Sequence, residues 1–154
     1  LLNKGAGGVR AILRHPIFMQ TFLPYSDFIE SAKILDNKRL GKQRVEAFQI
    51  LKALRGDYSK TGAWENHPAT RMWRGYSPSL TIYMNICIQE WCRRGFNNTM
   101  KKINIKNNRI ISPPWLGDPD FHASHREHLL RKDPEFYGQY DWSESNELPY
   151  VWPI

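Results

Sequence analysis

A cluster of charged residues near position 40 carries the groups in this sequence that are best suited to chemistry. Four cationic side chains precede a single carboxylate: Lys38, Arg39, Lys42 and Arg44, then Glu46. On a helix, Lys38, Lys42 and Glu46 recur every four residues and therefore share one face. Two interpretations are open. Lys42 and Glu46 can form a solvated ion pair worth about 0.3–0.5 kcal/mol, or Glu46 is a catalytic carboxylate framed by phosphate-holding cations.

A helix is expected to position this cluster. Apolar residues recur at spacings of three to five between Leu40 and Leu54, as they do on an amphipathic helix. Asp36 can cap the N terminus, and Gly56, which follows Arg55, is typical of a helix end. The first half of this helix would therefore carry the polar cluster, and its apolar face would enter the core.

Three further helices are predicted around it. A short helix is expected over residues 27–35, capped by Ser26, and the clearest helix is capped by Ser77 and ended by Gly95. A last helix is expected to begin after Asp118. The pattern predicts a mainly α fold in one domain over about residues 19–154. We expect a common core of Leu80, Tyr83, Cys87, Trp91, Phe48 and Leu51.

The overall charge points to an anionic partner. The 154 residues carry a net charge of +7, with a pI near 9.5, which favours nucleic acid. No apolar run approaches the roughly 18 residues needed to span a bilayer, so no membrane association is expected. Cys87 and Cys92 lie five apart on a predicted helix and would face different ways, which favours a reducing, intracellular compartment without a disulfide.

Two further segments combine cations with aromatic or amide side chains. The loop after the cluster carries His67, Arg71 and Trp73, and aromatic rings in such loops can stack on unpaired bases. The segment from 93 to 109 carries Arg93, Arg94, Lys101 and Lys102 among its six cations and no acid. We expect these cations to border one nucleic-acid surface together with those near position 40.

Other features give weaker indications. Residues 1–18 are basic and contain no acid, which is compatible with a flexible arm, a vector-derived remnant or an organelle-targeting segment. His122, His125 and His128 are spaced by three, so at most two would face one metal ion, and no metal site is expected.

Several separate blocks resemble one known family, the pyrimidine-dimer DNA glycosylases, which include the phage endonuclease V enzymes and small bacterial relatives. The blocks are Gln20–Leu23, Asp36–Glu46, Asn66–Tyr76, Glu90–Gly95, Pro113–Asp118 and Ser124–Tyr137. The resemblance implies a compact helical domain of the endonuclease V type, with long loops and an irregular aromatic C-terminal tail.

The resemblance also implies a reaction without metal or cofactor on double-stranded DNA with damaged bases. An amine would attack the sugar, assisted by a carboxylate, and the resulting imine would allow strand scission. Glu46 is the expected carboxylate. The amine would be the N-terminal one, once the residues before Met19 or Gln20 are removed, with the side chain of Lys42 as the second choice.

If the chain is such an enzyme, the remaining roles fall to two blocks that combine cations with groups able to exchange protons. Arg39 and Arg44 would hold flanking phosphates, while His67 and Arg71 would orient the extruded nucleotide. The site is then expected where the helix that follows Asp36 meets the 67–76 loop. The alternative is a non-catalytic structural subunit of a nucleoprotein assembly, with residues 1–18 as an arm that threads into nucleic acid or a partner protein.

Overall fold

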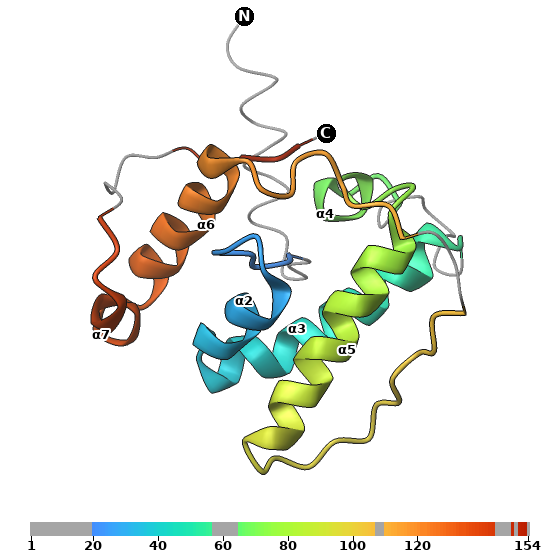
Figure 1. Cartoon of the computed structure of the whole chain (residues 1–154), viewed down its shortest axis with the longest axis horizontal. Coiled ribbons are helices and arrows are strands. Elements are labelled where there is room, and N and C mark those ends of the chain that lie inside the picture. Colours follow the sequence, from blue (N-terminus) through green and yellow to red (C-terminus); the bar gives the residue numbers. More distant parts are fainter. Residues whose placement is uncertain (1–19, 57–64, 107–109, 144–148, 150, 154) are drawn as a thin grey trace, which may run out of the picture.

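The computed structural model describes residues 20–56, 65–106, 110–143, 149 and 151–153. The suggested arm over residues 1–18 lies outside these ranges. Within them the chain is helical and forms no strand, which confirms the mainly α prediction, and no helix is long and apolar enough to cross a bilayer. The helices, shown in Figure 1, are α2 (Phe28–Ile34), α3 (Asn37–Leu54), α4 (Pro68–Arg71), α5 (Ser77–Arg93), α6 (Pro119–Lys132) and α7 (Pro134–Tyr137), followed by the 3-10 turn η1 (Gly138–Tyr140).

The helix ends follow the capping residues with two exceptions. Asp36 and Asp118 cap α3 and α6 as predicted, each accepting a backbone N–H in the first turn. Asp27, not Ser26, caps α2, because its carboxylate accepts two backbone N–H groups there. Helix α5 begins at Ser77 itself, so that residue lies one position inside the helix and not at the cap.

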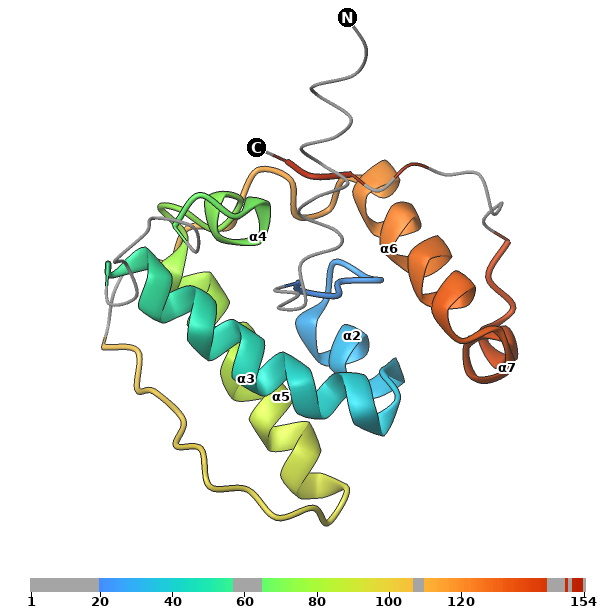
Figure 2. The same ribbon diagram turned by 180° about the vertical axis from the view of Figure 1, so that it is seen from behind.

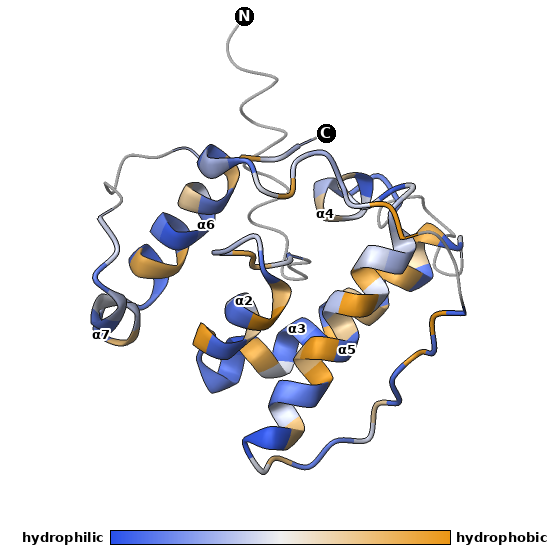
Figure 3. Cartoon of the chain, in the orientation of Figure 1, coloured by the Kyte–Doolittle hydropathy of each residue, from blue (hydrophilic) through white to orange (hydrophobic). Residues whose placement is uncertain are grey.

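The core forms where α3 packs along α5, and their apolar faces meet (Figure 3). Tyr83, Cys87 and Leu51 are buried there as expected. Phe48 was wrongly placed in the core: it is 37% exposed, with the Lys52 ammonium 5.7 Å from its ring centroid. The reason is geometric, since the apolar stripe of α3 is wider than the face that its neighbours cover.

The two long helices approach closely at a glycine. A Cβ placed on Gly41 of α3 would lie only 2.9 Å from the Trp91 ring of α5. Trp91 is therefore half-buried between the helices and not fully inside the core; its ring stacks on Phe96, with centroids 4.3 Å apart. Glycine at position 41 thus sets the spacing of α3 and α5.

Helix α6 lies on the other side of the molecule, and the segment 20–27 runs between it and the α2–α3–α5 group (Figures 1 and 2). Two histidines of α6 hold this segment. His125 Nδ1 accepts the backbone N–H of Leu23 at 2.9 Å, and His122 Nδ1 donates to the Leu23 carbonyl at 2.7 Å. Two of the histidines spaced by three along α6 thus bind both backbone polar groups of Leu23.

Candidate active site at the Glu46 pocket

A pocket of about 270 Å³ lies beside the first half of α3. Its walls come from three parts of the chain: the segment before α2, helix α3 and the end of α6. The lining residues are Gln20, Phe22, Lys38, Arg39, Lys42, Glu46 and Lys132. All of the sequence cluster that suggested chemistry, except Arg44, therefore lines a pocket large enough to admit a sugar-sized group.

Glu46 is the carboxylate of this pocket, and its donors in the described residues are uncharged. Its Oε2 accepts the backbone N–H of Gln20 at 3.3 Å and the side-chain amide of Gln43 at 3.0 Å. Burial raises the pKa of the Glu46 carboxyl from 4.5 to about 7, against the opposing effects of these donors and of the charges on Lys42 and Lys132. A carboxyl that titrates near neutrality can both donate and accept a proton.

Gln43 holds residues 20 and 22 beside Glu46. Its side-chain amide donates to the Gln20 carbonyl at 2.7 Å, and its Oε1 accepts the Phe22 N–H at 2.8 Å. The Tyr83 hydroxyl lies 2.6 Å from the same Oε1. Together with the histidine contacts at Leu23, this network holds the segment against α3, so the carboxylate and its donors are positioned in advance.

Arg39 is oriented at the pocket by a second carboxylate. Its Nη1 donates to Asp36 Oδ1 at 3.0 Å, and the same oxygen accepts the Tyr137 hydroxyl. Tyr137 also accepts the backbone N–H of Asp36 at 3.1 Å. The start of α3 is thus tied to α7, which places the cationic side of the pocket next to the end of α6.

A family model described as pyrimidine dimer DNA glycosylase matches residues 19–104. The chain belongs to this family. The match includes Gln20, α3 and Glu46, but ends before α6 and Lys132. No curated protein and no solved structure matched the chain.

The structure of this glycosylase-family chain places the other predicted residues away from the pocket. The pocket's lining residues in the described chain include none from 67–76, so the predicted meeting of α3 with that loop does not form this site. His67 caps α4 by accepting the Ala69 N–H at 3.1 Å. Trp73 is fully buried, and its Nε1 donates to Thr21 at 3.2 Å. Arg71 is exposed on α4, so its proposed DNA contact stays a prediction.

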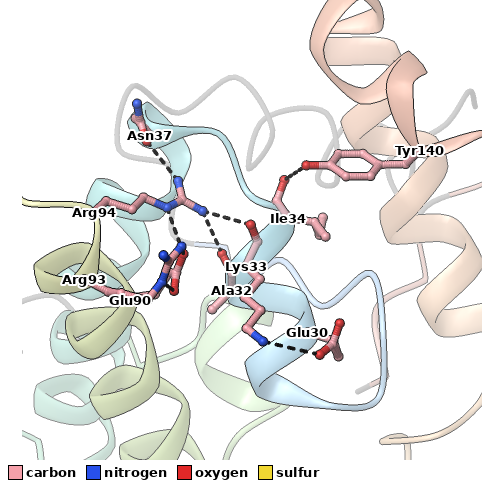
Figure 4. A network of polar contacts seen from close by, with 9 residues as sticks. All are labelled: Glu30, Ala32, Lys33, Ile34, Asn37, Glu90, Arg93, Arg94 and Tyr140. Atoms are coloured by element: carbon pink, nitrogen blue, oxygen red, sulfur yellow. Dashed lines mark hydrogen bonds and ion pairs between the residues drawn. The ribbon is translucent and has the colours of Figure 1, made fainter.

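Several of the predicted phosphate-binding arginines are engaged with protein groups. Arg44 donates to Asn98 at 2.7 Å and lies 4.2 Å from the Trp91 ring centroid. Arg93 and Arg94 both bind Glu90 on their own helix. Arg94 further joins α5 to α2 and α3, through the carbonyls of residues 32 and 33 and the Asn37 side chain (Figure 4).

Lys101 and Lys102 lie on a different surface. They line a mostly apolar groove of about 470 Å³, to which Val45 and Phe48 on the outer side of α3 also contribute. The groove and the Glu46 pocket thus use neighbouring faces of one helix. Contact of both the groove and the pocket with DNA stays a prediction.

Sequence reasoning missed three residues of the site: Phe22 and Lys132, which line the pocket, and Gln43, which binds the Glu46 carboxylate. Gln43 lay inside the recognised block, but a glutamine among four cations carries no pattern of its own. Phe22 and Lys132 come from segments far from position 46 in the chain. Only the folded arrangement brings them to the same pocket.

In the described part of the chain, no group of three His, Cys, Asp or Glu side chains could hold a metal ion. His122 and His125 instead bond Leu23, as described above. His122 Nε2 also accepts the N–H of Gly117 at 2.9 Å. The histidines of α6 therefore act in packing and in holding the segment 20–24.

Proposed function

We propose that this chain is a DNA glycosylase and abasic-site lyase that acts on damaged pyrimidines, with Glu46 as its catalytic carboxyl group. Family membership supports pyrimidine-dimer glycosylase chemistry. The single observation that carries the mechanism is the Glu46 carboxyl, whose pKa is raised to about 7 in a pocket lined by four cations. Such a group is protonated in part at neutral pH, as a general acid requires.

The cations suit the substrate of such a reaction. Lys38, Arg39 and Lys42 would hold phosphates on either side of the reacting nucleotide, because a sugar in the pocket places its phosphates at the rim. Protonated Glu46 would then transfer its proton to the ring oxygen of the sugar as an amine bonds to C1′. No metal or cofactor is invoked in this sequence of steps.

Covalent trapping tests this proposal. We expect sodium borohydride to trap the chain on duplexes that carry one thymine dimer or one abasic site, because reduction makes an imine permanent. Glu46→Gln should reduce the trapping rate by about 10²–10⁴ and leave DNA binding nearly intact. Glu30→Gln on the exposed face of α2 is the matched control and should trap at the wild-type rate.

The two outcomes separate the enzyme from its alternative. Binding to both duplexes with no adduct would contradict the enzymatic proposal. That result would favour the non-catalytic nucleoprotein subunit. A version of the chain that begins at Gln20 should be assayed in parallel, because its free α-amine would lie beside Glu46.

A further inference from the structure

We propose that Gln43 is a positioning residue of this site, whose side-chain amide holds residue 20 against the Glu46 carboxyl group. The Tyr83 hydroxyl stabilises the direction in which that amide faces. This inference rests on the proposed function above and explains how its two reacting groups, the carboxyl group and the N-terminal amine, stay together. Gln43 is not among the described residues that line the pocket, so it acts through these groups and not on the substrate.

The Gln43 amide uses its full capacity for hydrogen bonds. Its Nε2 donates to the Gln20 carbonyl at 2.7 Å and to Glu46 Oε2 at 3.0 Å. Its Oε1 accepts the Phe22 N–H at 2.8 Å, and the Tyr83 hydroxyl lies 2.6 Å from the same oxygen. An amide has two protons and an oxygen with two lone pairs. All four positions are therefore occupied in a side chain that is only 1% exposed.

The direction of this amide is determined by its neighbours. The Phe22 N–H can only donate and the Gln20 carbonyl can only accept. The amide oxygen of Gln43 must therefore face Phe22, and its NH₂ group must face Glu46. The reversed amide would set its oxygen against the Gln20 carbonyl and the Glu46 carboxylate, which is unfavourable in a buried position.

Tyr83 adds a hold from the core. It is fully buried on α5, and its one hydroxyl proton faces two acceptors, Gln43 Oε1 at 2.6 Å and the Phe22 carbonyl at 2.9 Å. Burial raises the pKa of this hydroxyl, so it keeps its proton at neutral pH. The packing of α5 on α3 thus fixes the oxygen of the Gln43 amide and, through it, the NH₂ group on the pocket side.

The contacts of Gln43 keep residue 20 within reach of Glu46. The Gln20 nitrogen lies 3.3 Å from Glu46 Oε2, and the Gln43 amide binds both the Gln20 carbonyl and the same Oε2. These three hydrogen bonds close a ring, so residue 20 cannot move away without breaking two of them. An N-terminal amine at the start of this segment is then delivered to the carboxyl group in the contact that proton exchange requires.

A neutral donor suits this task better than a cation. The charged groups around the Glu46 pocket are Lys38, Arg39 and Lys42 of α3 and Lys132 of α6. The hydrogen bond from Gln43 lowers the pKa of the Glu46 carboxyl, but burial outweighs it and the pKa remains near 7. A guanidinium group at the same place would favour the ionised form more strongly. The amide therefore fixes the position of the carboxyl group and leaves it able to carry a proton.

The first test follows the Glu46 carboxyl group itself by carbon-13 NMR on the full 154-residue chain, with Glu46→Gln to identify its signal. Gln43→Met keeps the length of the side chain and removes the donor, so the pKa of Glu46 should rise from about 7 to about 8. Tyr83→Phe removes only the hydroxyl and should raise this pKa by less. Gln49→Met, the same change at a half-buried position of α3, is the matched control and should leave it unchanged.

The second test measures the rate of borohydride trapping on an abasic duplex at saturating DNA, with the full chain and with the version that begins at Gln20. Gln43→Met should trap about 10²-fold more slowly, because the amine and the carboxyl group lose their common hold. DNA affinity should stay nearly unchanged, because the side chain does not line the pocket. Tyr83→Phe should slow trapping by a smaller factor, and Gln49→Met should trap at the wild-type rate.

The outcomes separate this inference from the proposed function. A raised Glu46 pKa together with slower trapping in Gln43→Met supports the positioning role, since a loss of stability alone would change neither. A folded Gln43→Met variant with the wild-type pKa or the wild-type trapping rate overturns the role and leaves the proposed function standing. If Gln43→Met does not fold, the same two measurements on Tyr83→Phe decide. If no form of the wild-type chain is trapped, the proposed function fails, and the role of Gln43 fails with it.

Discussion

Glu90 on α5 is a buried carboxylate and Glu46 on α3 a half-buried one, and their surroundings give the two opposite properties. Glu90, with a side chain only 7% exposed, is bound by Arg93 and Arg94 at 2.6 and 3.0 Å. Hydrogen bonds from Arg93 lead the effects that lower its pKa, and they outweigh burial. Glu46 has two uncharged donors in the described residues, and burial raises its pKa to about 7.

The difference shows how one fold separates structure from chemistry. At Glu90 both arginines bind the carboxylate, and Arg94 also joins three helices (Figure 4). At Glu46 the cations surround the pocket and act on the carboxylate only through their charge, so they can also meet phosphates. A carboxylate held by neutral amides therefore keeps a proton near pH 7, whereas one held by guanidinium groups does not.

The largest expected effect is on the pH dependence of cleavage. The single-turnover trapping rate on an abasic duplex should rise with pH as the attacking amine loses its proton and then level off in a limb above pH 7, because the Glu46 carboxyl, whose pKa is about 7, loses its proton there. Glu46→Gln should remove this limb along with most of the rate. Glu90→Gln should keep the limb, and a limb that vanishes in Glu90→Gln would reverse the comparison.

The second effect is on the stability of the fold, and here the destabilising substitution is at Glu90 and not at Glu46. Glu90→Gln should destabilise the fold by clearly more than the loss of a surface ion pair, because it removes the negative charge that holds the Arg94 side chain, which is only 15% exposed. Urea unfolding with circular dichroism measures the change. Glu30→Gln, whose ion pair with Lys33 is exposed, should cost less than about 1 kcal/mol; an equal cost in both variants would show that the Glu90 network contributes no more than a surface pair.

Stability should also depend on pH in opposite senses at the two carboxylates. Glu90, whose pKa is lowered, stabilises the fold when it is ionised, whereas Glu46, whose pKa is raised, does so when it is protonated. The folded pKa of Glu46 lies above its ordinary 4.5, so its contribution to stability is present below pH 4.5 and is lost as the pH rises through about 7. At pH 8, Glu46→Gln should therefore be more stable than wild type by up to about 3 kcal/mol. Unfolding curves from pH 4.5 to 8.5 test this, and a gain independent of pH would contradict it.

The sequence predicted α3 well because all its signals are local. The cap at Asp36, the glycine after Arg55 and the apolar period lie within one stretch, and so does the stripe that carries Glu46. Phe48 shows the limit of this reasoning. A period identifies an apolar face, but the width of the face that becomes covered depends on neighbours that are distant in sequence.

The pocket itself required the fold. Glu46 stood out by its type and spacing, while Lys132 at the end of α6 looked like an ordinary helix-terminal lysine. For Trp73 the sequence indicated a function that the structure does not support. A tryptophan in a basic loop suggested stacking on bases, but its side chain is buried against Thr21. Type and spacing indicate what a residue can do, but burial decides whether it meets a ligand.

The smallest effect tests whether the cations near Glu46 contact phosphates while those near Glu90 only stabilise the fold. Lys38 is exposed at the pocket, so Lys38→Ala should reduce the slope of log K against log salt by about 0.9 for duplex DNA. All three guanidinium nitrogens of Arg94 already donate to protein groups. Arg94→Ala should therefore lower stability and leave the slope unchanged. Fluorescence anisotropy titrations between about 50 and 200 mM salt measure both slopes on folded protein. Equal losses of slope would show that Arg94 also contacts phosphate, and that the cations around Glu90 serve DNA binding as well as the fold.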